Sequence, residues 1–251
     1  MKHDAVVIIP TIRQPPVTTL EAFSTGDWPV IIQADPRVFP DHAQYYRESP
    51  HLVVIGGEGI ANQLAAAYQS ASSRGFPFWF KVDDDLPRKS FVDIEGKNPD
   101  LPEVLGYLRS CIRLTHTTHA GLSNTTRANW LTDKYSRSFA LIHGGINIAA
   151  SSQNPWKYID PRIVRSGDVY RSCAHRRESL AVGRVGFIGV NKNLSTKECA
   201  IDITREQLDG DKEIILSQFA DLLEFTGVKT HHGNMMLGWK FKRGNSWRPG
   251  Q

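Results

Sequence analysis

The sequence has few cysteines: Cys111, Cys173 and Cys199 are scattered over 251 residues. Neither a disulfide framework nor the paired cysteine spacing of a zinc site can be built from three such positions. A reducing, cytoplasmic environment is therefore expected.

Long hydrophobic runs are also missing. No stretch approaches the roughly 20 apolar residues that a membrane span needs. The opening segment, MKHDAVVIIP, has an apolar run that is too short for a signal peptide. No internal repeat and no linker divides the chain, and its 40% hydrophobic and 22% charged residues are typical of a globular protein. One domain with no membrane contact is the expectation.

Acidic residues are scarce in part of the second half. From Lys157 to Lys197 there are nine Lys or Arg residues against three acidic ones, a net charge of +6. Residues 239–251 carry four basic residues and no acidic one. Such a basic surface favours a phosphate-bearing partner, either a nucleotide or a nucleic acid. A solvated basic face is an equally good interpretation.

The first 85 residues alternate short apolar runs with helical patterns. Apolar residues from Ile60 recur at i, i+4, i+7, i+8 and i+11, on one face of a helix that Gly75 would end. The runs predicted to be buried strands are Ala5–Ile9, Val30–Gln33, Leu52–Ile55 and Phe78–Val82. This order predicts an α/β fold with a Rossmann-like, mixed but mostly parallel sheet flanked by helices.

The pattern is less regular after residue 90. We expect a helix within residues 99–114 and two short strands around Gly144–Gly145, within Ser138–Ala150. A strand is expected at Val185–Lys192, and a helix over Lys212–Gly227 that ends on its glycine. The single domain would comprise a nucleotide-binding half (1–90), a more irregular half (91–238) and a basic tail (239–251).

Three consecutive carboxylates, Asp83, Asp84 and Asp85, follow the apolar run FWFKV. Ligands of open α/β sheets bind outside the carboxyl ends of the strands, which is where this triplet would lie. The alternation of side chains along a strand places Asp83 and Asp85 on one side and Asp84 on the other. Two carboxylates with substrate phosphates suit Mg²⁺ or Mn²⁺. An acidic surface turn is the alternative.

An Asp-x-Asp-like triplet after alternating strands and helices resembles the GT-A glycosyltransferases. The opening VVIIPTIRQP is similar to the first strand and nucleotide-binding loop of that family. GIANQLAAAYQSASSRG before FWFKVDDD is similar to its next conserved region, with Asn62–Gln63 in place of Arg-Asn. The resemblance implies a single GT-A-like domain, a nucleotide-sugar donor such as a UDP-sugar, and a divalent metal, Mn²⁺ or Mg²⁺, at the triplet.

The resemblance also implies roles for later residues. Asp168, in SGDVYRSCAHRR, would act as general base on the acceptor hydroxyl of an inverting enzyme, although a helix cap is an equal alternative. The segment HGGIN would let sugar and acceptor approach closely, and KTHHGN would supply a late metal ligand. The donor-binding candidates are Arg13, Asp35, Asn62, Asp83, Asp84 and Lys192; the metal candidates are Asp83, Asp85, His231 and His232; the acceptor-binding candidates are His143, Gly144, Gly145, Arg171 and Arg176.

For the acceptor, PTIRQ, KVDDDLP, HGGIN and SGDVYRS are together similar to the phage-type, TET-associated glycosyltransferases. That resemblance implies transfer to 5-hydroxymethyl-pyrimidines in DNA, such as 5-hydroxymethylcytosine, in the host cytoplasm if the chain is encoded by a bacteriophage. Basic patches would follow the phosphate backbone, and the modified base would be flipped out of the duplex. The alternatives are a protein or glycan acceptor, a metal-dependent nucleotidyltransferase or nuclease, and a non-catalytic nucleic-acid-binding module.

Overall fold

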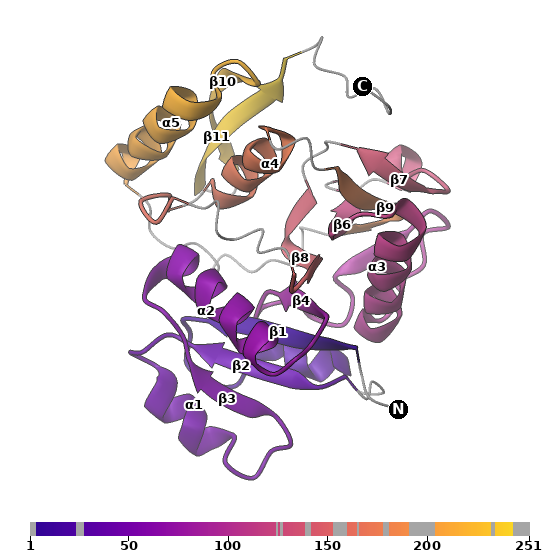
Figure 1. Cartoon of the computed structure of the whole chain (residues 1–251), viewed down its shortest axis with the longest axis vertical. Coiled ribbons are helices and arrows are strands. Elements are labelled where there is room, and N and C mark those ends of the chain that lie inside the picture. Colours follow the sequence, from indigo (N-terminus) through magenta and orange to yellow (C-terminus); the bar gives the residue numbers. More distant parts are fainter. Residues whose placement is uncertain are drawn as a thin grey trace.

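The computed structural model contains one large mixed sheet with helices on both faces and a separate two-stranded hairpin (Figure 1). Nine strands of the described residues belong to the large sheet. The described residues are 4–23, 28–123, 125, 128–138, 142–152, 160–164, 166–177, 181–190, 204–231 and 234–242. The predicted α/β class is confirmed.

The parallel half of the sheet has the strand order β3-β2-β1-β4. Its strands lie where the apolar runs predict them: β1 (Ala5–Thr11), β2 (Val30–Ala34), β3 (Leu52–Ile55) and β4 (Phe78–Val82). The 3₁₀ helix η1 (Thr18–Phe23), α1 (Phe39–Tyr45) and α2 (Gly59–Ser73) connect them.

The other half is mostly antiparallel. β8 (Ile142–Ala150) pairs with both β4 and β6 (His119–Ser123), and β6 pairs in parallel with β9 (Val182–Val190). β5 (Phe91–Asp93) and β7 (Tyr135–Ser138) also pair with β9, and α3 (Leu101–Thr115) covers this half. β8 is one strand through Gly144 and Gly145, so the predicted division into two strands is wrong, but its pairing with β6 shifts register between Asn147 and Ile142.

The region after residue 204 differs most from the prediction. α4 (Gly167–Arg177) precedes it, and α5 (Arg205–Phe219) ends eight residues before Gly227. The chain then forms the hairpin of β10 (Leu223–His231) and β11 (Asn234–Phe241). Gly227, at φ +112°, occupies an irregularity of this hairpin, and a residue with a side chain rarely adopts that conformation. The first residues of the expected tail, from Trp239 to Phe241, are therefore part of a strand.

β1 explains how the core is divided between the two faces of the sheet. Ala5, Val7 and Ile9 pack on the side of η1 and α3, whereas Val6 and Ile8 pack on the side of α2, α4 and α5. All five side chains are fully buried. Because both faces are covered, the strand reads as a continuous apolar run rather than an alternating one.

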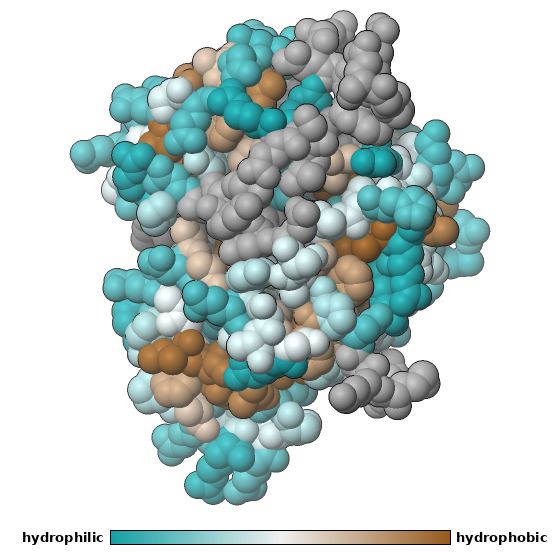
Figure 2. Space-filling view, viewed as in Figure 1, coloured by the Kyte–Doolittle hydropathy of each residue, from teal (hydrophilic) through white to brown (hydrophobic). Residues whose placement is uncertain are grey.

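One edge of the sheet keeps apolar side chains at the surface. Leu52 and Ile55 of β3 are 44% and 58% exposed, and hydrophobic residues gather over this edge in the space-filling view (Figure 2). Within the described part of the chain, no helix has the length and apolar character that crossing a bilayer requires.

Candidate functional site

The carboxyl ends of β1 and β4 meet in the middle of the sheet. From β1 the chain continues through β2 to β3 at one edge, and α2 then returns it to β4 on the other side of β1. Open α/β sheets bind ligands where the strand order reverses in this way. The residues that end or follow these two strands, 11–13 and 83–85, therefore define the candidate site.

Asp83 is paired with a lysine from the strand that precedes it. β4 ends at Val82, and the Asp83 amide donates to the carbonyl of Gly145 at 2.8 Å. Lys81, whose side chain is only 6% exposed, donates to the Asp83 carboxylate and, at 2.8 Å, to the carbonyl of Gly144. Lys81 thus balances the charge of Asp83 and joins the end of β4 to β8.

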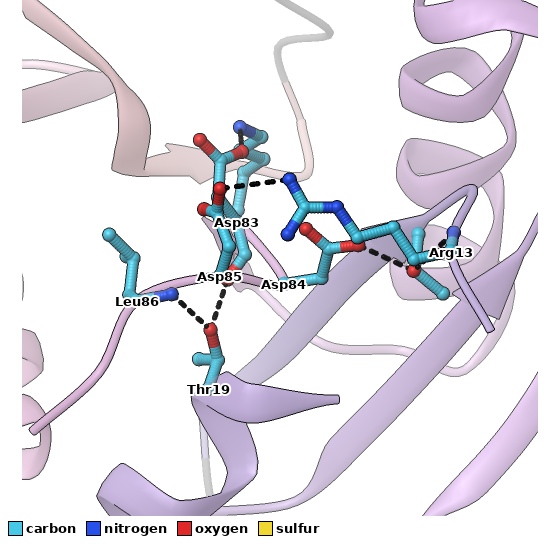
Figure 3. A network of polar contacts seen from close by, with 8 residues as sticks. Arg13, Thr19, Asp83, Asp84, Asp85 and Leu86 are labelled. Atoms are coloured by element: carbon cyan, nitrogen blue, oxygen red, sulfur yellow. Dashed lines mark hydrogen bonds and ion pairs between the residues drawn. The ribbon is translucent and has the colours of Figure 1, made fainter. Parts of the chain in front are cut away.

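The other two aspartates are held by the loop that follows β1 (Figure 3). The Thr11 hydroxyl donates to Asp84 Oδ2 at 2.5 Å, and Arg13 Nη2 donates to Asp85 Oδ2 at 3.1 Å. Asp84 points toward β1, apart from its neighbours, as expected. This direction results from a turn at Asp84–Asp85, because β4 ends before the triplet. The predicted cause, alternation of side chains along a strand, is therefore wrong.

Burial sets the electrostatics of Asp84. It raises the pKa of this carboxyl above its ordinary value, while the Thr11 hydroxyl and the charge of Arg13 act in the opposite direction. The neighbouring carboxylates of Asp83 and Asp85 add a smaller upward effect. The three carboxylates therefore differ in burial and in partner, and we expect them to differ in role.

Thr19 of η1 fixes the backbone of the triplet. Its side chain is fully buried, and Oγ1 donates to the Asp83 carbonyl at 2.5 Å while accepting from the Leu86 amide at 2.8 Å (Figure 3). Its own amide donates to the Asp84 carbonyl at 3.2 Å. Buried backbone groups need such partners, so one threonine determines the course of this turn.

The donor set fits a divalent metal only in part. Asp83 is engaged by the nearly buried Lys81, whereas Arg13, the partner of Asp85, has a side chain that is 37% exposed. Over the described ranges, no group of three or more His, Cys, Asp or Glu side chains is arranged to hold a metal ion. Of the predicted metal ligands described, Asp85 is the one that would fit a divalent metal, together with oxygens of a bound phosphate.

Another carboxylate, from α4, lies against β8. A Cβ built on Gly144 would lie 3.8 Å from the Cβ of Asp168 and 4.0 Å from its Oδ2. Asp168 Oδ1 accepts from the Val169 amide at 2.9 Å. Since Lys81 bonds to both Gly144 and Asp83, the first turn of α4 and the triplet border the same segment of β8.

Arg171 lies deeper in the protein than its predicted role requires. It is 1% exposed, and burial lowers its pKa to about 10 although the charge of Asp168 opposes this shift. His119 and His175 are equally buried, with ring centroids 5.3 Å apart, and burial and the charge of Arg171 lower the pKa of His119. This burial argues against direct contact between Arg171 and a polymeric acceptor. The acceptor role of the half-buried Arg176 stays a prediction.

Asp35 is occupied by its neighbour Arg37. The guanidinium donates to both carboxylate oxygens, at 2.7 and 2.9 Å, and these bonds lower the pKa of Asp35. The Asp35 amide donates to the Thr11 carbonyl at 2.8 Å, so this loop adjoins the site. Asn62, exposed in the first turn of α2, donates to the Glu58 carbonyl at 2.8 Å. The predicted nucleotide contacts of Asp35 and Asn62 stay predictions.

Four other predicted side chains are not among those described. Lys192 and His232 lie outside the described residues, and so do the side chains of His143 and His231. The backbone of His231 pairs with Asn234 in the hairpin, which is a separate sheet from the one that carries the triplet. The donor, metal and acceptor roles of these four residues stay predictions.

Three residues of the site carry no prediction from the sequence: Thr11, Thr19 and Lys81. Lys81 had a usable signal, because a lone lysine inside the apolar run FWFKV must find a partner if it is buried. The two threonines had none, since their partners lie 64 to 73 residues away.

Comparison with known proteins gives a likeness of fold alone. No family model matches the chain, and no curated protein does. A CMP:2-keto-3-deoxy-manno-octonic acid synthetase matches at TM-score 0.47 and 13% identity, over 85% of this chain and 99% of the other. A putative nucleotide-diphospho-sugar transferase from Desulfovibrio desulfuricans G20 matches at 0.48 and 11%, over 86% and 98%. A 4-diphosphocytidyl-2C-methyl-D-erythritol synthase from Anaerococcus prevotii DSM 20548 matches at 0.49 and 8%, over 84% and 95%.

These three proteins are named for nucleotidyl or nucleotide-sugar chemistry, and none is named for glycosyl transfer to DNA. At such TM-scores and identities the likeness does not extend to chemistry, which has to be argued from the site itself.

Proposed function

We propose that this protein is a glycosyltransferase that uses a nucleotide-sugar donor, with a UDP-sugar as the first candidate. The observation that carries the proposal is the meeting of three elements at the reversal of strand order. The loop after β1 contributes Arg13, the turn after β4 contributes the triplet, and α4 contributes Asp168 next to Gly144. Such a site offers a cation for phosphate on one side and a carboxylate for proton transfer on the other.

Arg13 is the residue proposed to bind the donor diphosphate. Its guanidinium is partly exposed and already rests on an anion, Asp85, and arginine binds phosphate in a two-point fashion. A divalent metal held by Asp85, when bound, would neutralise the charge that develops on the departing diphosphate. Lys81 holds the turn between β4 and β8 in place.

Asp168 is the residue proposed to act on the acceptor. In an inverting reaction its carboxylate takes the proton of the acceptor hydroxyl, and the oxygen forms a bond to the anomeric carbon. The bond between that carbon and the diphosphate oxygen breaks, and the nucleoside diphosphate leaves with the electron pair. Gly144 leaves space beside Asp168, because a side chain at this position would lie against it.

For the acceptor we propose the hydroxymethyl group of a modified pyrimidine in DNA. The support is the net charge of +6 between Lys157 and Lys197, together with the family resemblance. Four of its nine basic residues, Lys157, Arg165, Lys192 and Lys197, lie outside the described residues. A protein or glycan acceptor is the second possibility, and the burial of Arg171 favours it, because a buried arginine offers no phosphate contact.

Nucleotidyl transfer is a second candidate reaction. The observation in its favour is that the partly exposed Arg13 lies beside the carboxylates of the triplet, since a cation next to possible metal ligands also suits a triphosphate substrate. The two reactions differ in their products: glycosyl transfer releases a nucleoside diphosphate, and nucleotidyl transfer releases pyrophosphate.

The test is a mass-spectrometric screen of nucleotide sugars against hydroxymethylated and plain DNA, with and without Mn²⁺. We expect a mass gain of one sugar on hydroxymethylated DNA only. Asp168→Asn should lower that rate by roughly 10²–10⁴-fold, as expected for loss of a general base. Asp221→Asn, which alters a 62% exposed carboxylate paired with Arg177, is the matched control.

Labelling of glycans or proteins but not DNA would exclude the DNA acceptor. Pyrophosphate release from a nucleoside triphosphate, with no sugar transfer to any acceptor, would replace the proposal with nucleotidyl transfer.

A further inference from the structure

A buried histidine of α1 holds the loop that follows β1. His42 of α1 is 0% exposed, and its Nε2 lies 2.7 Å from the carbonyl oxygen of Arg13. A carbonyl only accepts hydrogen bonds, so Nε2 must carry the proton. His42 therefore donates to the backbone of the residue whose guanidinium reaches the triplet.

The same helix anchors the far end of the loop. The Tyr46 hydroxyl accepts from the Val17 amide at 2.7 Å, and the His42 and Tyr46 rings stack with centroids 5.8 Å apart and an interplanar angle of 13°. Burial raises the pKa of Tyr46, so its hydroxyl stays protonated. The two stacked rings thus hold both ends of residues 13–17 through hydrogen bonds to the backbone.

Arg13 is consequently held at its backbone, while its guanidinium pairs with Asp85 at the other end of the side chain. Thr11 Oγ1 accepts from the Arg13 amide at 3.1 Å, and His42 donates to the Arg13 carbonyl. Beyond these two backbone bonds the side chain is 37% exposed, and its Nη2 donates to Asp85 Oδ2 at 3.1 Å. A site residue held in this way binds its ligand with less ordering cost.

We propose that His42 is a positioning residue for donor binding: its Nε2–H holds the Arg13 backbone so that the guanidinium meets the donor diphosphate. The inference rests on the proposed function, because it assigns the diphosphate to Arg13. It adds that α1, which supplies no predicted donor ligand, determines affinity through a main-chain hydrogen bond.

The test compares variants that keep or remove the donor atom. His42→Phe keeps the aromatic stacking on Tyr46 but loses Nε2–H. His42→Gln can place an amide N–H near the same position, whereas the shorter His42→Asn cannot reach the Arg13 carbonyl. Affinity for the tightest-binding of UDP, CDP, GDP and ADP is measured by titration calorimetry. A thermal melt of each variant confirms folding.

We expect His42→Phe and His42→Asn to weaken nucleotide binding by roughly tenfold, because Arg13 loses the hydrogen bond that positions its backbone, and His42→Gln to bind within about threefold of the parent because it restores that bond. In an Arg13→Met background, His42→Phe should cost less than about twofold, because sites that act as one unit are not additive. If His42→Phe does not fold, the difference in nucleotide affinity between His42→Gln and His42→Asn tests the proposal by itself.

The outcomes distinguish the role of His42 from the proposed donor site. An equal loss from His42→Phe with and without Arg13, or equal binding by the Gln and Asn variants, would overturn the role of His42. No change on Arg13→Met, or no binding of any of the four nucleotides, would overturn the proposed donor site.

Discussion

Replacing Thr19 by valine should destabilise the protein through the turn that carries the triplet. Valine has nearly the same shape, so the change removes the hydroxyl without opening a cavity. That hydroxyl serves two backbone groups, the Asp83 carbonyl and the Leu86 amide, at 2.5 and 2.8 Å. Two lost hydrogen bonds, with buried partners left unpaired, correspond to about 2–4 kcal/mol of unfolding free energy. For a chain of this size that is a fall in Tm of about 5–15 °C.

The assay is urea unfolding at neutral pH, followed by circular dichroism, together with a thermal scan. Thr18→Val is the matched control, because Thr18 begins the same 3₁₀ helix and is exposed; its effect should stay within about 0.5 kcal/mol. Thr19→Ser should recover most of the loss. A Thr19→Val protein as stable as the Thr18→Val protein would refute the view that this hydroxyl fixes the turn.

Three further predictions concern single residues. Burial raises the pKa of Asp84 in the folded state above the ordinary 3.8, so the folded protein loses stability as pH rises from 3.8 through the raised pKa and the carboxyl ionises. Asp84→Asn should therefore be more stable than the parent in urea unfolding at pH 7. This difference in unfolding free energy should disappear below about pH 3, where Asp84 is protonated in both states. Gly186→Ala should lower the free energy of unfolding by several kcal/mol, since its Cβ would lie 2.5 Å from the Lys134 carbonyl oxygen. Gly144→Ala is the control and should lower it by under about 1 kcal/mol in the same urea unfolding experiment. Burial raises the pKa of Cys111 to about 11, so peptide mass mapping should find it alkylated by iodoacetamide at pH 8 only after unfolding.

The parallel half of the fold was predictable because its signals are local. Strands buried on both faces need unbroken apolar runs, and α2 needs one apolar face, so the four strands could be read from residues close together in the chain. The position of the triplet followed from the same pattern, since the carboxyl end of a strand is known once the strand is known.

The segment after Phe219 was mispredicted because its sequence suits two structures. Leu222, Leu223 and Phe225 continue the helical spacing of α5, and Gly227 resembles a helix end. Pairing with β11 decides the conformation, as Phe225 lies opposite Trp239. The residues of β11 do not themselves identify a strand, so nothing near Phe225 in the sequence indicates that the segment pairs as a strand rather than continuing the helix.

The network within the site was not predictable for a similar reason. Thr11 and Thr19 bond to residues more than sixty positions away, and only the assembled sheet brings them together. The turn at Asp84–Asp85 ends the alternation, because side chains alternate only along an extended strand and β4 stops at Val82, before the triplet.

The central position of β1 has a consequence for the order in which the chain folds during synthesis. β1 is made before β4, yet it pairs with β2 on one side and with Phe78–Lys81 of β4 on the other. Until β4 has left the ribosome, the open edge of β1 and its apolar faces lack their final partners. Non-local pairing of this kind slows folding and exposes sticky surface. A nascent chain that ends before residue 82 therefore leaves β1 without β4 and is exposed to aggregation at that edge.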